Sequence, residues 1–201
     1  MSKRRYTLKQ RAESHEDTRR RIVEATARLH EEVGPRDTTI SAIAQEAGVQ
    51  RLTVYRHFPD EKELFKACTS HWLALNPPPE PTAWSHQEGL ARVRQALSQL
   101  YRYYRRTERM WTGSYRDEAD VPALQEPMRQ FRNFLVGIGT DLAEHLEPEL
   151  EATDCNRTTL THAIQFYTWQ SLARQGLNDA SMADLVCDWI RGAGRAQQSV
   201  A

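Results

Sequence analysis

Several features that mark secreted proteins, membrane proteins and metal sites are scarce or missing in this sequence. Its three cysteines, Cys68, Cys155 and Cys187, are too widely spaced for a disulfide framework or a zinc site, and we expect them to be buried as small apolar residues. No apolar run approaches the length of a membrane span, and the basic first eleven residues lack the apolar segment of a secretory signal. A cytoplasmic protein with no membrane partner is therefore expected.

Motifs of catalysis are also missing. The seven histidines are dispersed, and the sequence contains no H-E-x-x-H, no G-x-S-x-G and no glycine-rich loop that would cradle a phosphate. His145, which lies near Glu144 and Glu147, comes nearest to a cluster, but its position at a predicted helix end is typical of an ordinary charge pair. We therefore expect no catalytic residues, no metal and no cofactor, and the protein is not expected to be an enzyme.

Residues 38–58 have the pattern of two short helices that meet at a glycine. The first helix has one apolar face, made by Ile40, Ile43, Ala44 and Ala47. Thr38 or Thr39 supplies its N-cap. Gly48 follows, and glycine enters the left-handed backbone region without steric cost, which allows a sharp turn. The pattern predicts a helix-turn-helix.

The second helix runs from Gln50 to about His57, and Leu52 and Val54 are expected to face inward. The side chains that remain for solvent or ligand are Gln50, Arg51, Thr53, Tyr55, Arg56 and His57. Gln and Arg suit adenine and guanine edges in the major groove, while Thr, Tyr and His suit phosphates and thymine methyl groups. A short polar helix is also compatible with a solvated connector, because the helix-glycine-helix pattern alone is loose.

The flanking residues favour the DNA-binding interpretation. From Gly34 the chain reads GPRDTTISAIAQEAGVQRLTVYRHFPDEKELF, and it resembles the tetracycline-repressor-like (TetR) family of bacterial transcriptional regulators. The resemblance covers about the first third of the chain and rests on Thr38-Thr39, Ile43-Ala44, Ala47-Gly48-Val49, Tyr55-x-His57-Phe58, Leu64 and the apolar helix with Ile22, Ala25, Leu29 and Val33. It implies a regulator that represses transcription.

The resemblance also implies roles for individual residues. Thr39 would contact a phosphate, and Tyr55 and His57 would bind the DNA backbone. The residues that would face bases are Gln50, Arg51 and Thr53. The sequence departs from the family after Pro59-Asp60, where Glu61 takes a position that usually carries a phosphate-binding lysine. Lys62 or Arg56 could supply that contact instead, and the sequence leaves both possibilities open.

The formal net charge of +0 is unevenly distributed along the chain. Residues 1–75 hold 14 Lys and Arg against 11 Asp and Glu, whereas the remainder holds 13 against 16. The basic start of the chain predicts that residues 1–15 form a flexible arm. This arm is either a solvated tail without a partner or a segment that follows phosphates or enters the minor groove.

A proline run at residues 76–81 is the predicted domain boundary. Residues 16–75, the head, would form the helix-turn-helix domain with a connecting fourth helix, and residues 82–197, the body, a helical ligand-binding and dimerisation domain. Nothing in the sequence has the alternation of a strand, so the predicted fold is all-α with about nine helices. The helices expected in the body are a long one from about 85, a short one at 109–115, a long one at about 128–142, and two that carry apolar stripes at 160–171 and 182–190.

The last two helices resemble the pair that forms the dimer interface of the family, although an intramolecular core would give the same pattern. A homodimer would place two recognition helices about 34–36 Å apart on a palindromic double-stranded operator. An unidentified small-molecule effector is expected among aromatic residues of the body, since aromatic walls with a few polar groups are typical of ligand pockets as well as of plain core. The residues selected for this site are Tyr101, Tyr104, Trp111, Phe134, Phe166, Trp169 and Gln170.

The predicted function is that of a ligand-responsive, sequence-specific transcriptional repressor that a small molecule releases from DNA. The alternative is a helical DNA-binding regulator that has no small-molecule site and is controlled by a protein partner.

Overall fold

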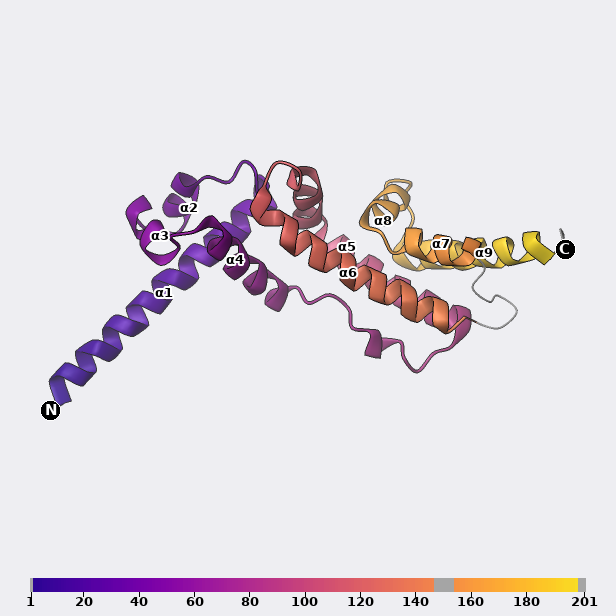
Figure 1. Ribbon diagram of the computed structural model, residues 1–201, viewed down its shortest axis with the longest axis horizontal. Helices are drawn as coiled ribbons and strands as arrows, with labels where there is room; N and C mark the ends of the chain where they lie inside the picture. Colours follow the sequence, from indigo (N-terminus) through magenta and orange to yellow (C-terminus); the bar gives the residue numbers. More distant parts are fainter. Residues whose placement is uncertain (1, 147–153, 199–201) are drawn as a thin grey trace. The chain divides into compact units, whose positions relative to one another are not determined.

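A computed structural model describes residues 2–146 and 154–198, with side chains described at 10, 12–146 and 154–193. Nine α-helices and one 3₁₀ turn, with no strand, occupy these residues (Figure 1). The prediction of an all-α fold with about nine helices is confirmed. Within the same residues, none of the helices combines the length and the apolar character that a membrane crossing requires.

The chain divides into two compact units, and two helices contribute residues to both. Unit 1 consists of Met1–Pro77 and Arg109–Met128, and unit 2 of Pro78–Glu108 and Arg129–Ala201. The boundary between Pro77 and Pro78 falls inside the proline run, where the domain boundary was predicted. The segment Arg109–Met128, which was expected in the body, packs within unit 1.

Unit 1 contains α1 (Ser2–Glu32), α2 (Ile40–Glu46), α3 (Arg51–His57) and α4 (Glu61–Leu75). Helix α1 packs against α2 and α4, and α2 packs against α3. The buried core of these helices is made by Ile22, Val23, Ala25, Ile43, Ala44, Ala47, Val54, Phe58 and Leu64.

Residues 2–15, for which a flexible arm was predicted, continue α1 as a helix (Figure 1). The reason is visible in the sequence, because no glycine or proline interrupts α1 and its many Lys, Arg, Gln and Glu residues favour helix. The basic composition of the segment therefore does not by itself prevent regular structure.

The loop after α1 is held by the end of α5 within unit 1. Asp117 is fully buried, and its carboxylate accepts hydrogen bonds from the Arg116 side chain at 2.6 and 2.9 Å and from the Arg36 backbone N–H at 3.1 Å. The Arg116 guanidinium also donates to the Val33 carbonyl at 2.9 Å. The hydrogen bond from Arg116 is the main reason that the pKa of Asp117 lies below its usual value. This network fixes the entry to the helix-turn-helix.

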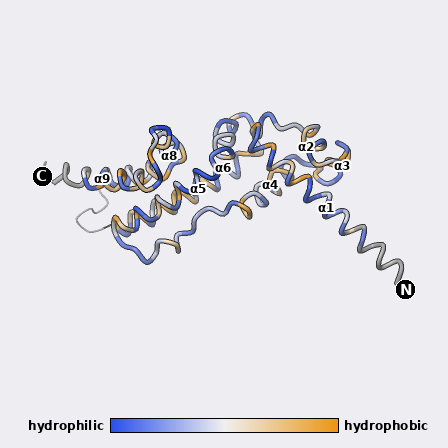
Figure 2. The backbone as a smooth tube through the Cα atoms, turned by 180° about the vertical axis from the view of Figure 1, so that it is seen from behind, coloured by the Kyte–Doolittle hydropathy of each residue, from blue (hydrophilic) through white to orange (hydrophobic). Residues whose placement is uncertain are grey.

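Unit 2 contains η1 (Pro81–Ala83), the first part of α5 (Gly89–Asp117), most of α6 (Pro122–Glu144), α7 (Asp154–Ala163), α8 (Phe166–Ala173) and α9 (Asp179–Gln198). Hydrophobic and hydrophilic residues alternate along α5 and α6 (Figure 2). Helices α7, α8 and α9 pack against one another.

Two expectations about these helices were wrong. Residues 109–115 do not form a separate short helix but continue α5, because no helix-breaking residue precedes them. The stripe at 160–171 is divided between α7 and α8, since Gln165 adopts an extended backbone with φ −75° and ψ 144°. The apolar spacing is similar on both sides of this break, so periodicity did not indicate it.

The cysteines also differ from expectation in one case. Cys68 and Cys187 are buried, and burial raises the pKa of the two thiols to about 12 and about 11. Cys155, at the start of α7, is exposed, and the prediction of burial was wrong for this residue.

Candidate nucleic-acid interface

The turn between α2 and α3 forms for local reasons. Thr39 is the N-cap of α2, and its hydroxyl accepts a hydrogen bond from the Ala42 N–H at 3.1 Å. At the other end Gly48 has a φ of +64°, a conformation that side-chain-bearing residues rarely adopt. The Val49 N–H then donates to the Ala44 carbonyl at 2.9 Å, which closes the turn.

Two arginines of α1 hold the ends of the motif helices. Arg21 donates to the carbonyls of Ala47 and Gly48 at the end of α2. Arg19 donates to the His57 carbonyl at 3.2 Å, and its guanidinium lies 4.1 Å from the centre of the Phe58 ring. Carbonyls at helix ends lack partners within their own helix, and cations near them are stabilising. The sequence pattern does not single out either arginine, because both resemble solvated residues of a basic helix.

Helix α3 presents most of its side chains to solvent. Val54 is fully buried, and Phe58, at the helix end, is 3% exposed. The exposed residues of the segment are Gln50, Arg51, Leu52, Tyr55 and Arg56, whereas Thr53 and His57 are half-buried. The expectation that Leu52 faces inward was wrong, because this side chain is 66% exposed. Successive residues leave a helix about 100° apart, so Leu52 and Val54 point about 200° apart and cannot share the buried face.

His57 lies in a confined position at the end of α3. Its ring centre is 4.2 Å from that of His15 on α1, and its buried Nδ1 has no hydrogen-bond partner among the described residues. Burial, followed by the charges of His15 and Arg19, lowers the pKa of His57. A neutral imidazole at neutral pH would bind a phosphate by donating a hydrogen bond rather than by charge.

The start of α4 combines acidic and basic residues. Asp60 caps the helix, since its carboxylate accepts the Lys62 N–H at 3.0 Å. Glu61 and Glu63 occupy the first turn, where negative charge stabilises a helix but disfavours a nearby phosphate. Lys62 and Arg56 are both exposed. Either one remains a candidate for the backbone contact.

Most residues predicted to bind an effector lie in the core of unit 2. Tyr101 and Tyr104 are fully buried and donate hydrogen bonds to the carbonyls of Ala163 and Ile164 at 2.8 and 2.7 Å. The Tyr104 ring centre lies 5.4 Å from that of Phe166, and Phe166 lies 5.5 Å from Trp169. Buried Gln170 and half-buried Phe134 also belong to unit 2.

Trp111 belongs instead to unit 1, where its ring meets that of Trp72 edge to face at 5.9 Å. The Trp72 indole N–H donates to the Glu31 carboxylate at 2.7 Å.

Among the described residues, no group of three or more His, Cys, Asp or Glu side chains is arranged to hold a metal ion.

The comparisons with known proteins agree with this geometry. Residues 22–68 match the model of a family described as bacterial regulatory proteins, tetR family. The head of this chain therefore carries a helix-turn-helix segment of the TetR type. The matched segment contains α2 and α3, whereas Arg19 and Arg21, which hold their ends, directly precede it. No curated protein matches the chain by sequence.

Several solved structures share the fold of this chain. A Clostridium perfringens protein with a proposed role in regulating fatty acid metabolism has a TM-score of 0.63 at 17% identity, covering 85% of this chain and 96% of that chain. A TetR-like regulator from a Rhodococcus species has a TM-score of 0.60 at 16% identity, covering 86% and 93%. NalD, the secondary repressor of the MexAB-OprM multidrug efflux pump in Pseudomonas aeruginosa, has a TM-score of 0.57 at 16% identity, covering 90% and 96%.

Proposed function

We propose that this TetR-family regulator binds a palindromic operator as a homodimer, with α3 of each protomer in a major groove. The observation that carries the proposal is the exposure of Gln50 and Arg51 on a helix that buries Val54 and is held at its end by Arg19. A helix so anchored presents polar side chains at a fixed angle, as base recognition requires.

Within this proposal the exposed residues have distinct tasks. Gln50, Arg51 and Thr53 face base edges, and Thr53 does so from a half-buried position. The residues assigned to the DNA backbone are Thr39, Tyr55, Arg56, His57 and Lys62. The backbone contacts set the position of α3 along the groove, and the base contacts select the sequence.

Replacing Arg51 with alanine is expected to weaken binding to the operator by about 1–3 kcal/mol for each half-site, because one bidentate contact to guanine is lost. Binding to scrambled DNA should change much less. Fluorescence anisotropy on a duplex selected from a random pool, at a fixed salt concentration, measures both affinities and the number of protomers bound.

The matched control is Arg102→Ala, which removes an exposed arginine from α5 in unit 2 and should leave both affinities unchanged. Equal binding of the wild-type protein to selected and scrambled duplexes would contradict sequence-specific recognition. A single protomer at saturation on a palindromic site would contradict the dimer.

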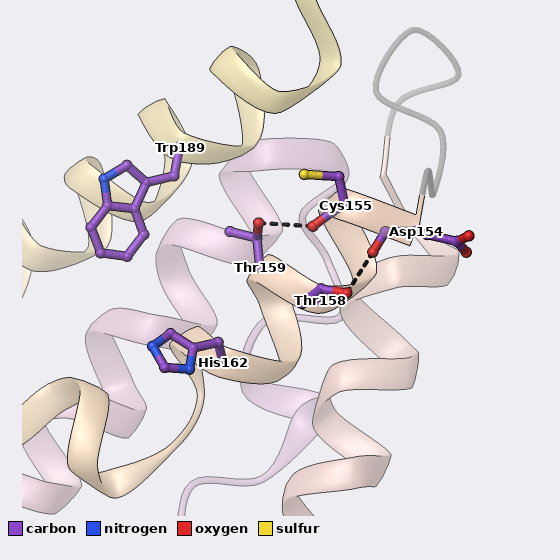
Figure 3. A pocket seen from close by; sticks show the side chains of 6 residues that line it. All are labelled: Asp154, Cys155, Thr158, Thr159, His162 and Trp189. Carbon is purple, nitrogen blue, oxygen red and sulfur yellow. Dashed lines mark hydrogen bonds between the residues drawn. The ribbon is translucent and has the colours of Figure 1, made fainter. Parts of the chain in front are cut away.

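We propose that the dimer forms through the last two helices, α8 and α9. The exposed aromatic residues there support this surface, since Tyr167 is 57% and Trp189 38% exposed. Trp189 borders a hollow of about 540 Å³ between α7 and α9 (Figure 3). The other residues that line it are Asp154, Cys155, Thr158, Thr159 and His162. A bulky aromatic side chain beside a hollow suits an isologous interface, in which each protomer supplies both features.

Size-exclusion chromatography with light scattering at micromolar concentration should give twice the chain mass of 23.2 kDa. Trp189→Glu should shift the mass toward that of one chain, because a buried unpaired charge disfavours the interface. Leu75→Glu, at an exposed leucine of unit 1, serves as the control and should leave the dimer intact. A wild-type monomer would exclude a stable dimer at this concentration.

We propose that a small molecule bound in unit 2 releases the repressor from DNA. The support is the buried Trp169 indole N–H, which has no hydrogen-bond partner among the described residues and lies within an aromatic cluster. Aromatic walls with few polar groups are typical of small-molecule sites. Helices α5 and α6 each contribute residues to both units, so a displacement in either unit acts on a shared helix.

A further inference from the structure

An exposed leucine lies on the face of α3 that points away from the core of the head. Counting about 100° per residue, Leu52 points about 200° away from buried Val54. Tyr55 and Arg56, both exposed, lie about 60° and 40° from Leu52 on its two sides. Leu52 is 66% exposed, so neither neighbour covers it. Leu52 and Arg56, which is also two residues from Val54, therefore point equally far from this buried side chain, and of the two only Leu52 is apolar.

Exposed leucines are common on protein surfaces, and exposure alone needs no explanation. The position of Leu52 is what distinguishes it. It belongs to the first turn of a recognition helix, where side chains reach base edges, and it directly follows Arg51. If α3 enters the major groove as proposed above, Leu52 approaches the floor of the groove.

The chemistry of that floor restricts what a leucine can select. Guanine, adenine and cytosine edges present acceptors and donors in the major groove, while thymine adds a C5-methyl group. A leucine over an unpaired donor or acceptor removes water from it without replacing the hydrogen bond, which is unfavourable. Apolar contact with the thymine methyl group carries no such cost.

We propose that Leu52 is a specificity-determining residue that selects thymine through its C5-methyl group. The inference rests on the proposed DNA-binding function and adds one base preference to it. Polar neighbours such as Arg51 then account for guanine or adenine next to this thymine, so the central part of each half-site combines one apolar and one polar contact.

The test uses deoxyuridine, which differs from thymidine only by the missing methyl group. Each thymine of a duplex selected from a random pool is replaced in turn, at both symmetric positions, and the full-length protein is titrated by fluorescence anisotropy. At one position in each half-site the replacement should weaken wild-type binding about fourfold per methyl group, and about fifteenfold for both. Leu52→Ala should bind the thymine duplex more weakly and lose most of this sensitivity.

Leu75→Ala removes a leucine that is 69% exposed on α4 and should retain the full sensitivity to the methyl group. The thermal melting of both variants should match the wild type, because neither leucine is part of the core. The proposal is wrong if no thymine replacement weakens wild-type binding, or if Leu52→Ala is as sensitive as wild type. If the wild-type protein still prefers the selected duplex over a scrambled one, either result leaves the proposed function intact. If the wild-type protein has no such preference, the proposed function and the role of Leu52 are both wrong.

Discussion

Replacing Arg92 with methionine is expected to lower the free energy of unfolding by about 3–5 kcal/mol, because it breaks a buried ion pair. Arg92 is 4% exposed, and its guanidinium donates to both carboxylate oxygens of Asp141, at 2.6 and 3.1 Å. It also donates to the carbonyls of Ser85 and Gln87, each at 3.1 Å. The Trp84 indole N–H completes the cluster by donating to Asp141 at 3.1 Å. Methionine fills much of the space but leaves the carboxylate and two carbonyls without these donors.

Urea unfolding followed by circular dichroism measures the loss. The matched control is Arg94→Met, since Arg94 lies on the same helix and pairs with Asp184 at a site where both side chains are 53% exposed. Exposed pairs contribute about 0–1 kcal/mol, so this control should change stability little. If the two substitutions lowered the free energy of unfolding equally, the effect of Arg92→Met would not depend on the burial of its ion pair.

The same cluster has a defined pH dependence. Burial alone would raise the pKa of Asp141, but the hydrogen bonds from Arg92 and Trp84 and the charge of Arg92 outweigh it and hold the pKa below 3.8. A carboxylate with a depressed pKa contributes its stability above the unfolded value. The contribution is therefore complete at neutral pH and is lost only as the pH falls below 3.8.

Lowering the pH from 7.5 to 5 is expected to reduce the free energy of unfolding by about 2 kcal/mol through His30 alone. Burial lowers the pKa of this imidazole from 6.5 to about 4, against the opposing charge of Asp117. The ring centre lies 4.8 Å from that of Phe65, and its Nδ1 is 3.7 Å from the Cys68 sulfur. The unfolded chain therefore binds a proton near pH 6.5 that the folded chain does not accept until about pH 4, so stability falls as the pH decreases through this window.

Urea unfolding at a series of pH values, compared between the wild type and His30→Gln, isolates this contribution. The variant should be less stable at pH 7.5 but should lose about 2 kcal/mol less than the wild type on going to pH 5. His86→Gln removes an exposed histidine and should keep the wild-type pH dependence. Parallel curves for the wild type and His30→Gln would assign the pH dependence to other groups.

Much of the head could be predicted from local patterns. The apolar face of α2 and the need for glycine at position 48 are encoded in neighbouring residues, and both are present in the structure. Leu52 was misplaced because an apolar residue near the start of a short helix was assigned to the core. The angle between Leu52 and Val54 allows only one of them to be buried, and packing against the other helices of the head selects Val54.

Interactions between distant segments could not be predicted in this way. Arg92 and Asp141 lie 49 residues apart, and nothing in their immediate sequence distinguishes them from other charged residues on long helices. Trp111 likewise packs against Trp72, although the two residues lie far apart in the sequence. The aromatic residues predicted to bind an effector occur at helical spacing, which is the same for a packed core and for a pocket wall.

The shortness of α3 has a consequence for how the regulator works in a cell. If α3 reads an operator as proposed, a helix of 7 residues brings only about three or four side chains to base edges, so each half-site specifies few base pairs. Among on the order of 10⁶ or more competing positions in a genome, many partial matches then act as decoys. Occupancy of the operator depends on how far the number of protein molecules exceeds the decoys that retain them. Transcriptional control by such a protein is therefore sensitive to its own copy number.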